Sequence, residues 1–273
     1  MPGMRSSYFQ LMILFLSIYC IGCSTYLVNK TTFFPQAGIQ VDPQRLNVPI
    51  EHTYIKTDDN IKISAFFIPR KDVSRTIIFF PGNGGNASHR LGDALALWSL
   101  RANVLLMDYR GYGLSAGDPS EKGVYLDAEA GLKFILDEKL TPIEEIVIYG
   151  RSLGSAVAVN LAQNRKFAGI ILVSPLSSGK AVARVRGLSW LTPFIGDPFN
   201  SLEKIEKIQS RLLVIHGDKD RIIPIEMGNR LCQQAKVENN LVIIPGAGHN
   251  DIITTDPELF FNTISSFLDE VAP

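Results

Sequence analysis

A short apolar run, a glycine-framed turn and a stretch of small residues follow one another at residues 145–162. Residues 146–149 are apolar and partly β-branched, which is typical of a buried strand, whereas residues 155–162 have the small-residue pattern of a packed helix. The turn between them, residues 150–154, reads GRSLG, a G-x-S-x-G sequence. Such a turn strains the backbone of its serine and exposes the hydroxyl, and a Cβ at either glycine would collide with the strand or the helix. We therefore predict that Ser152 is a nucleophile; the alternative is a glycine-rich turn with an ordinary surface serine.

The rest of the chain alternates between strand-like and helix-like segments. Apolar runs of strand length occur at residues 76–80, 103–107, 146–149, 168–173, 211–215 and 240–244. Helical patterns occur at residues 87–101, 122–140, 225–235 and 257–268. Two alternating runs, at residues 52–57 and 61–68, flank a turn and predict a β-hairpin ahead of the others. This order predicts an α/β fold in which a mostly parallel sheet, covered by helices on both faces, is entered through an antiparallel N-terminal hairpin.

A serine hydroxyl needs a base that takes its proton and a carboxylate that orients the base. Two of the four histidines, His52 and His89, lie well before the serine, and His216 ends a predicted strand. His249 lies in the loop PGAGHND at residues 245–251, between the last strand and the last helix. In a parallel sheet this loop opens on the edge where the serine turn lies. His249 is therefore the predicted base; the alternative is a loop histidine that is bonded locally.

The predicted acid lies in the loop that follows the strand at residues 212–215. Asp218 and Asp220 both leave the carboxyl end of that strand, which gives the chain order Ser, Asp, His. Spacing does not separate the two, and Asp251 is a third candidate. One of the pair is expected to be a turn-forming aspartate.

The negative charge that develops during acyl transfer needs two backbone N–H donors. One belongs to Leu153, directly after the serine, and the other to Asn83, in the glycine-rich loop at residues 81–86. A loop of this kind could also hold a phosphate, but it lacks the Gly-Lys-Ser/Thr of a P-loop. We therefore predict an oxyanion hole.

Taken together, these segments resemble the serine hydrolases of the alpha/beta-hydrolase superfamily. The chain is most similar to a small-lid subgroup that includes the alpha/beta-hydrolase-domain depalmitoylases and serine-aminopeptidase-like proteins. The matching segments are residues 81–86, 108–113, 150–154, 216–224 and 246–249, within a region from about residue 50 to the end. The resemblance implies an alpha/beta-hydrolase fold with a short lid at about residues 176–205.

The resemblance also assigns roles to individual residues. The acid of the family's His-Gly-x-x-Asp pattern falls on Asp220 rather than on Asp218. Asp108 and Arg110 match a structural motif beside the site. The family usually has His-Gly before the oxyanion residue, whereas this chain has Pro-Gly at residues 81–82; the backbone donor of the next residue is unaffected.

We therefore expect a serine hydrolase that cleaves a carboxylic ester or thioester through an acyl-enzyme, with no metal and no cofactor. The alternatives are a peptidase or amidase with the same triad, and a non-catalytic hydrolase-fold binding protein of the envelope. The apolar stretch at residues 190–199, in the lid position, favours a small-molecule or acyl substrate such as a palmitate ester. The alternative is that these aromatic residues only pack on the core.

The overall composition excludes some classes of partner. Lys and Arg together number 27, as do Asp and Glu, and no basic run is interleaved with aromatic residues. Nucleic acid is therefore not an expected partner. The three cysteines, Cys20, Cys23 and Cys232, form neither a disulfide framework nor a zinc pattern, and Cys232 is expected to be an ordinary buried thiol.

The N-terminus has the pattern of a secretion signal. Residues 11–21 are nearly all apolar and follow Arg5 without an acidic residue. This run is short for a transmembrane helix but has the length of a signal-peptide core. It ends in CIGCS at residues 20–24, which resembles the lipobox of bacterial lipoproteins, where a cysteine after a small residue is acylated and becomes the new N-terminus.

This second resemblance implies a lipoprotein-type signal peptide at residues 1–22 and lipidation of Cys23, although Cys20 stands where Leu or Val is usual. Ser24 in place of Asp implies the outer membrane of a bacterial cell envelope, with the protein facing the periplasm. A tether at residues 23–45 would then connect the lipid anchor with a single domain at residues 46–273. We therefore expect the membrane to be a partner through the N-terminal anchor.

Overall fold

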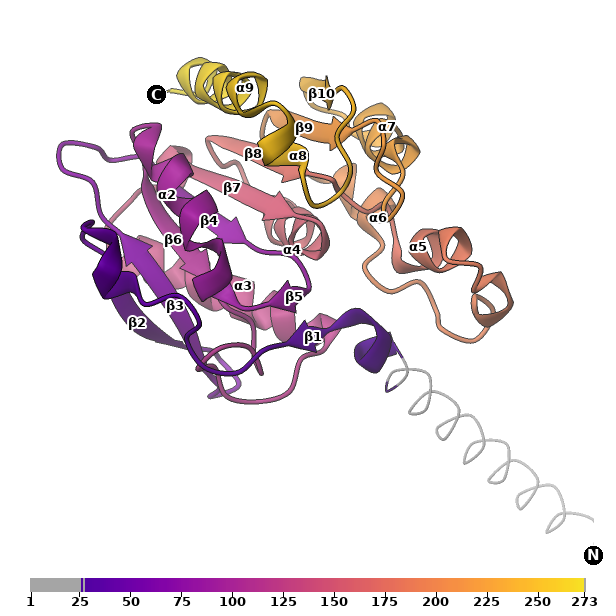
Figure 1. Cartoon of the computed structure of the whole chain (residues 1–273), viewed down its shortest axis with the longest axis horizontal. Coiled ribbons are helices and arrows are strands. Elements are labelled where there is room, and N and C mark those ends of the chain that lie inside the picture. Colours follow the sequence, from indigo (N-terminus) through magenta and orange to yellow (C-terminus); the bar gives the residue numbers. More distant parts are fainter. Residues whose placement is uncertain (1–25, 27, 273) are drawn as a thin grey trace, which may run out of the picture.

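The computed structural model describes residue 26 and residues 28–272, so Cys23 and the predicted signal peptide lie outside the described residues. Eight strands form one sheet in the order β10-β9-β8-β7-β4-β6-β3-β2 (Figure 1). They are β2 (Glu51–Lys56), β3 (Lys62–Ile68), β4 (Thr76–Phe80), β6 (Asn103–Met107), β7 (Ile146–Arg151), β8 (Gly169–Val173), β9 (Leu212–Gly217) and β10 (Asn239–Ile244). The strands from β10 to β6 pair in parallel, whereas β3 is antiparallel to both β6 and β2. The predicted parallel sheet with an antiparallel N-terminal hairpin is confirmed.

Helices cover both faces of this sheet. One face is covered by α3 (Glu121–Asp137), α4 (Leu153–Ala162) and α7 (Ile225–Gln234), and the other by α2 (Leu91–Ser99), α8 (Ile252–Thr255) and α9 (Pro257–Glu270). Alternate residues of each strand contribute to two separate apolar cores, because successive side chains of a strand point to opposite faces. In β7, for example, Ile148 packs in one core and Tyr149 in the other. Burial on both faces explains why these strands read as continuous apolar runs.

Several element boundaries differ slightly from those expected from the sequence. The segment predicted as one helix at residues 87–101 begins as a 3-10 helix, η2 (Ala87–Arg90), and continues as α2. Helix α3 ends at Asp137 rather than at residue 140, and its N-cap is Ser120, whose side chain accepts a hydrogen bond from the backbone N–H of Gly123. A short 3-10 helix, η3 (Ile143–Glu145), then leads into β7.

The segment between residues 31 and 40, predicted as part of a tether, is bound to the surface of the domain. Its short strand β1 (Phe34–Pro35) pairs in parallel with β5 (Gly84–Gly85), in the glycine-rich loop after β4. Further along, Ala37 forms an isolated bridge with Gly113, and a 3-10 helix, η1 (Pro43–Leu46), leads towards β2. We call residues 31–40 the strap. Its binding depends on backbone hydrogen bonds, which leave no periodic pattern in the sequence.

The lid region, residues 176–205, contains α5 (Gly179–Val185), a 3-10 helix η4 (Ser189–Leu191) and α6 (Ser201–Ile205). Its aromatic residues differ in their burial. Phe199 is 2% exposed and packs edge-on against Phe33 and Tyr125. Trp190 and Phe194 are 68% and 71% exposed. Packing on the core therefore accounts for Phe199 but not for the two aromatic residues at the tip of the lid.

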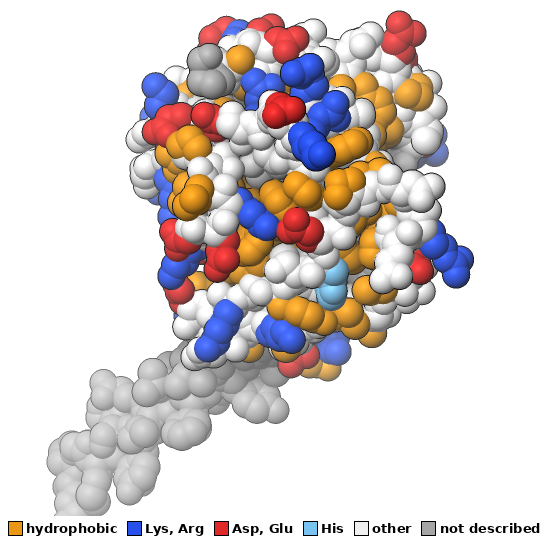
Figure 2. Space-filling view, turned by 90° about the vertical axis from the view of Figure 1, so that its left-hand side faces the viewer, with side chains coloured by type: hydrophobic (Ala, Val, Ile, Leu, Met, Phe, Trp, Pro, Cys, Tyr) orange, Lys and Arg blue, Asp and Glu red, His pale blue; other side chains and the backbone are white. Residues whose placement is uncertain are grey.

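On the face shown in Figure 2, basic and acidic side chains are interspersed with apolar ones, and no single sign of charge dominates. This mixture agrees with equal numbers of basic and acidic residues in the chain. Within the part of the chain that the structure describes, no helix combines the length and the apolar character needed to cross a bilayer.

Candidate active site

Ser152 lies at the turn from β7 into α4, near the middle of the sheet. Its φ of 54° and ψ of −120° place its backbone in a region that residues other than glycine rarely adopt. Its backbone N–H donates to the carbonyl of Val173, at the end of the neighbouring β8. The strained serine turn predicted from the G-x-S-x-G sequence is therefore present in the structure.

The two glycines of this turn lie where no side chain fits. A Cβ on Gly150 would lie 2.4 Å from the carbonyl oxygen of Gly154, and one on Gly154 would lie 2.0 Å from that of Phe80. The first clash is with α4 and the second is with the end of β4. Glycine is therefore required at both positions for α4 to start so close to the sheet.

Ser152, His249 and Asp220 form a continuous hydrogen-bonded chain. His249 Nε2 lies 2.9 Å from Ser152 Oγ, and His249 Nδ1 lies 2.7 Å from Asp220 Oδ2. Asp220 follows β9 and His249 follows β10, so both loops leave the carboxyl edge of the parallel sheet at which β7 ends. With Nδ1–H donating to the carboxylate, Nε2 is free to accept the proton of the serine hydroxyl.

The environment of Asp220 keeps it ionised. Burial alone would raise the pKa of this carboxyl, but contacts with His216 and His249 and the backbone N–H of Ile223 outweigh burial and hold the pKa below its usual range. Asp220 Oδ1 accepts from the backbone N–H groups of Ile222 and Ile223, at 2.9 and 2.8 Å. A charged, fixed carboxylate can therefore orient His249 and stabilise its protonated form.

His216 also lies at this site, although the sequence pattern assigned it no role there. It is fully buried, with Nε2 2.8 Å from the carbonyl oxygen of Ile223 and 3.5 Å from Asp220 Oδ2. His216 Nε2 therefore lies close to the same carboxylate oxygen of Asp220 that His249 Nδ1 contacts. Its place at the end of β9, four residues before the acid, was the available sequence signal.

The other candidate residues serve local structure. Asp218 accepts from the backbone N–H of Gly246 and Asp251 from that of Gly248, each at 2.7 Å. Both fix the loop that carries His249, and neither forms a hydrogen bond with the imidazole. His89 takes part in the cap of η2, and His52 lies 3.0 Å from the hydroxyl of Ser64, away from the serine.

The loop after β4 brings the backbone of Asn83 close to the nucleophile. A Cβ on the adjacent Gly82 would lie 3.4 Å from Ser152 Cβ, so the loop touches the serine. Neither the backbone N–H of Asn83 nor that of Leu153 donates to another residue in the described part of the chain. Both predicted oxyanion donors are therefore available at the site.

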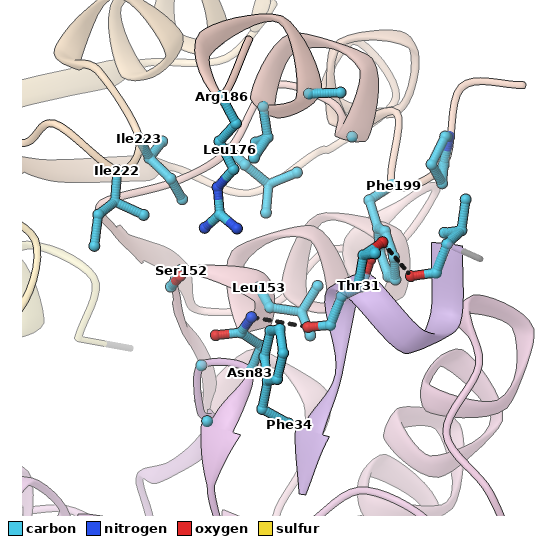
Figure 3. Close-up of a pocket in the computed structure, with 18 of the residues that line it drawn as sticks. Thr31, Phe34, Asn83, Ser152, Leu153, Leu176, Arg186, Phe199, Ile222 and Ile223 are labelled. Carbon is cyan, nitrogen blue, oxygen red and sulfur yellow. Dashed lines mark hydrogen bonds between the residues drawn. The ribbon is translucent and has the colours of Figure 1, made fainter. Parts of the chain in front are cut away.

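The strap holds this loop from outside. The side-chain amide of Asn83 donates to the carbonyl of Thr32 at 2.8 Å (Figure 3). The carbonyl oxygen of Asn83 accepts from the backbone N–H of Phe34 at 3.0 Å and from the hydroxyl of Tyr112 at 2.8 Å. Tyr109 donates to the carbonyl of Pro81, at the start of the loop. No motif in the sequence indicates that these residues position the loop.

A cavity of about 400 Å³ opens above Ser152. Its wall comes from the lid, the strap and the loops after β4 and β9, and much of it is apolar, with Leu176, Val182 and Phe199 on the lid side. Figure 3 shows these surroundings, with Ile222 and Ile223 on the opposite side from Phe199. Among the described residues no three metal-ligating side chains are grouped. The cavity is of a size and character suited to an apolar small molecule.

Comparison with known proteins places this geometry in a family. Residues 75–191 match the family model described as alpha/beta hydrolase fold. An uncharacterised protein of Mycobacterium tuberculosis is 33% identical over 248 residues, covering 89% of this chain and 88% of that protein. The human alpha/beta hydrolase domain-containing protein 17C is 33% identical over 232 residues, covering 84% of this chain and 68% of its own length.

Among solved structures, an esterase of Pyrococcus furiosus superimposes with a TM-score of 0.73 at 25% identity, covering 88% of this chain and 97% of the esterase. The fold and these neighbours support a hydrolase. The expected superfamily is thus confirmed by a family model, by relatives that align over most of their length and by a solved structure. The chain belongs to the alpha/beta-hydrolase family.

Proposed function

We propose that the protein is a serine hydrolase that cleaves carboxylic esters or thioesters through an acyl-enzyme. The observation that carries the proposal is the unbroken hydrogen-bonded chain from Ser152 through His249 to Asp220 beneath an apolar cavity. Ligand binding alone does not require a serine with a strained backbone that is hydrogen-bonded to a histidine, as Ser152 is to His249. The geometry therefore favours catalysis over a binding function.

In the proposed reaction, Ser152 Oγ attacks the acyl carbon while His249 Nε2 takes its proton. The oxygen of the tetrahedral intermediate accepts hydrogen bonds from the backbone N–H groups of Asn83 and Leu153. The protonated His249 then gives its proton to the leaving alcohol or thiol as the bond to the acyl carbon breaks. Water attacks the acyl-enzyme by the same route and releases the acid and the free serine.

Two observations favour esters and thioesters over peptides. The wall of the cavity above Ser152 is largely apolar and has no carboxylate among the described residues, which suits an acyl chain better than a polar peptide backbone. The Pyrococcus furiosus neighbour is an esterase. The matching human relative is named only for its hydrolase domain, so it adds no substrate to the argument.

The test is labelling by a fluorophosphonate probe together with hydrolysis of p-nitrophenyl esters. We expect Ser152→Ala to abolish both, and Asp220→Asn to lower kcat by a factor on the order of 10⁴, because the imidazole loses its orienting charge. Ser74→Ala, an exposed serine before β4, is the matched control and should label like wild type. Folded wild-type protein that neither labels nor turns over any ester would refute the proposal.

We further propose that the protein is anchored in a bacterial membrane by lipidation of Cys23. Four residues lie between Cys23 and Val28, which lines the cavity, and even a fully extended chain spans at most about 18 Å over that length. An anchor there would keep the cavity close to the bilayer surface. The exposed Trp190 and Phe194 on the neighbouring lid have the character of residues at a membrane interface.

Metabolic labelling with a clickable palmitate analogue tests the anchor. We expect label in the full-length chain and none in Cys23→Ser, since acylation needs the thiol. Cys232→Ser is the matched control because it also removes a thiol, lies outside the signal segment and should retain the label. Equal label in wild type and in Cys23→Ser would exclude the anchor without affecting the hydrolase proposal.

A further inference from the structure

The Arg, Lys, Asp and Glu residues that line the cavity above Ser152 are all arginines. Three arginines, Arg90, Arg151 and Arg186, belong to its wall, whereas none of the residues that line it is Asp or Glu. The three come from separate elements: η2, the end of β7, and the residue that follows α5 in the lid. The three guanidinium groups differ in their hydrogen-bond and ion-pair partners. This difference indicates which of them are available to bind a ligand.

Arg151 is already neutralised and has a structural role. Its Nη1 lies 3.0 Å from Asp93 Oδ2, and its Nη2 donates to the carbonyl oxygens of His249 and Asn250 at 3.4 and 3.3 Å. Arg151 therefore ties the loop that carries the base to α2. Its charge is balanced within the protein.

Arg186 has no such partner. No hydrogen bond or ion pair joins its guanidinium to another residue within the described part of the chain. In Figure 3 its side chain extends from the lid into the cavity, towards Ser152 and Leu153. Arg186 is an exposed residue, so its guanidinium is hydrated and can be reached by a ligand that enters the cavity. The direction of this side chain brings its charge to the reacting centre.

Arg90 is half-buried and also lacks a carboxylate partner among the described residues. Its guanidinium donates only to the carbonyl oxygen of Gly84, at 3.5 Å. Burial lowers its pKa and the nearby Arg151 lowers it further, while Asp93 acts in the opposite direction. Because Asp93 already pairs with Arg151, Arg90 keeps a half-buried positive charge that no carboxylate contacts within the described residues.

The remaining wall of the cavity is apolar. Val182, Leu188 and Leu191 of the lid line the cavity together with Leu176 and Phe199. The site thus combines a surface for a hydrocarbon chain with two guanidinium groups that lack counterions. Guanidinium groups form paired hydrogen bonds with phosphate, and two of them match the three terminal oxygens of a phosphate monoester.

We propose that the substrate is a fatty acyl ester whose alcohol carries a phosphate group, and that Arg186 and Arg90 bind this phosphate. The inference rests on the proposed ester hydrolysis and names its substrate class. The phosphate takes no part in the bond changes: water adds to the acyl carbon, the acyl–oxygen bond breaks, and the phosphorylated alcohol leaves with the proton from His249. Arg186 and Arg90 therefore determine which ester is bound, and they take no part in the bond changes.

The test compares two matched esters, 1-octanoylglycerol and 1-octanoylglycerol 3-phosphate, which share the acyl chain and the ester bond. Release of octanoate by the full-length protein gives kcat/KM for each. We expect wild type to prefer the phosphate ester by about 100-fold, because each of the two charge-assisted pairings contributes about tenfold, or about 1.4 kcal/mol. Arg186→Gln and Arg90→Gln should each lower this preference by about tenfold, mainly through KM, and Arg186→Lys should retain part of it.

Arg184→Gln is the matched control, because Arg184 is an exposed arginine of α5 that does not line the cavity. Its preference should equal that of wild type. A wild-type preference below about twofold, turnover of neither glycerol ester, or an equal loss in Arg184→Gln would overturn the proposal. Failure of the proposed function is distinguishable from these outcomes, since p-nitrophenyl octanoate would then also remain uncleaved.

Discussion

At the scale of single residues, the hydroxyl of Tyr112 links the strap to the oxyanion loop. This side chain is 2% exposed; its hydroxyl donates to the carbonyl of Asn83 at 2.8 Å and accepts from the backbone N–H of Phe34 at 3.1 Å. The Asn83 carbonyl belongs to the residue whose N–H we assign to the oxyanion hole. A small movement of this peptide would change the direction of that donor.

We predict that Tyr112→Phe lowers kcat on p-nitrophenyl esters by about three- to tenfold, with a smaller change in KM, because the lost bond acts on the transition state. The free energy of unfolding should fall by only about 1 kcal/mol, since Phe34 N–H still donates to Asn83 O. Tyr54→Phe, on the exposed β2, is the matched control. If both variants retain wild-type kcat, the hydroxyl does not position the loop.

The same scale shows what residue patterns can and cannot predict. The strand–turn–helix around Ser152 was predictable because its glycines are required by close approach of backbone atoms. Spacing alone left Asp218 and Asp220 equivalent, and the family resemblance separated them. In the structure Asp220 contacts His249, whereas Asp218 bonds to the backbone N–H of Gly246. Such a difference depends on the path of a loop, which local sequence does not determine.

At the scale of elements, the buried strands and the covering helices were predictable from periodicity. Short elements held by backbone hydrogen bonds were not. The strap is the main example: β1 pairs with β5 through a few main-chain bonds, and its apolar anchor Phe33 is a single buried residue. A segment with two prolines and no period is typical of a tether, and no pattern in residues 31–40 predicts this pairing.

The strap also lies between the proposed lipid anchor at Cys23 and the proposed active site. It begins eight residues after Cys23 and ends beside Ser88, whose hydroxyl accepts from the backbone N–H of Gln40. Between these points it contacts the oxyanion loop and lines the cavity through Thr31, Thr32 and Phe34. The segment that would connect the domain to a membrane anchor is therefore part of the wall of the site.

At the scale of the whole molecule, a buried carboxyl couples stability to pH. Asp108 is 2% exposed and accepts from the backbone N–H of Ala87 at 2.7 Å. Burial raises its pKa to about 7, although hydrogen bonds from Ala87 and Ser64 act in the opposite direction. The unfolded chain would have a pKa near 3.9 for this group.

The folded state binds the proton of the Asp108 carboxyl more tightly than the unfolded state does. Protonated Asp108 therefore contributes fully to the free energy of unfolding below about pH 4, and this contribution is lost as the pH rises to 7. The slope is at most about 1.4 kcal/mol per pH unit over about three units. We predict that Asp108→Asn, which can still accept from Ala87, removes this slope. The free energy of unfolding of Asp108→Asn minus that of wild type should therefore increase by several kcal/mol from pH 4.5 to pH 8.

Urea unfolding of wild type and Asp108→Asn at intervals between these pH values measures the difference directly. Groups that titrate identically in both proteins, including Asp220, cancel in the comparison. His52 requires a separate control because its ring lies 3.0 Å from the hydroxyl of Ser64, and the series is therefore repeated in a His52→Gln background. Asp58→Asn, in the exposed turn of the hairpin, should run parallel to wild type. Parallel curves for Asp108→Asn as well would mean that the buried carboxyl keeps the same charge throughout, and that its burial is compensated by the bonds from Ala87 and Ser64.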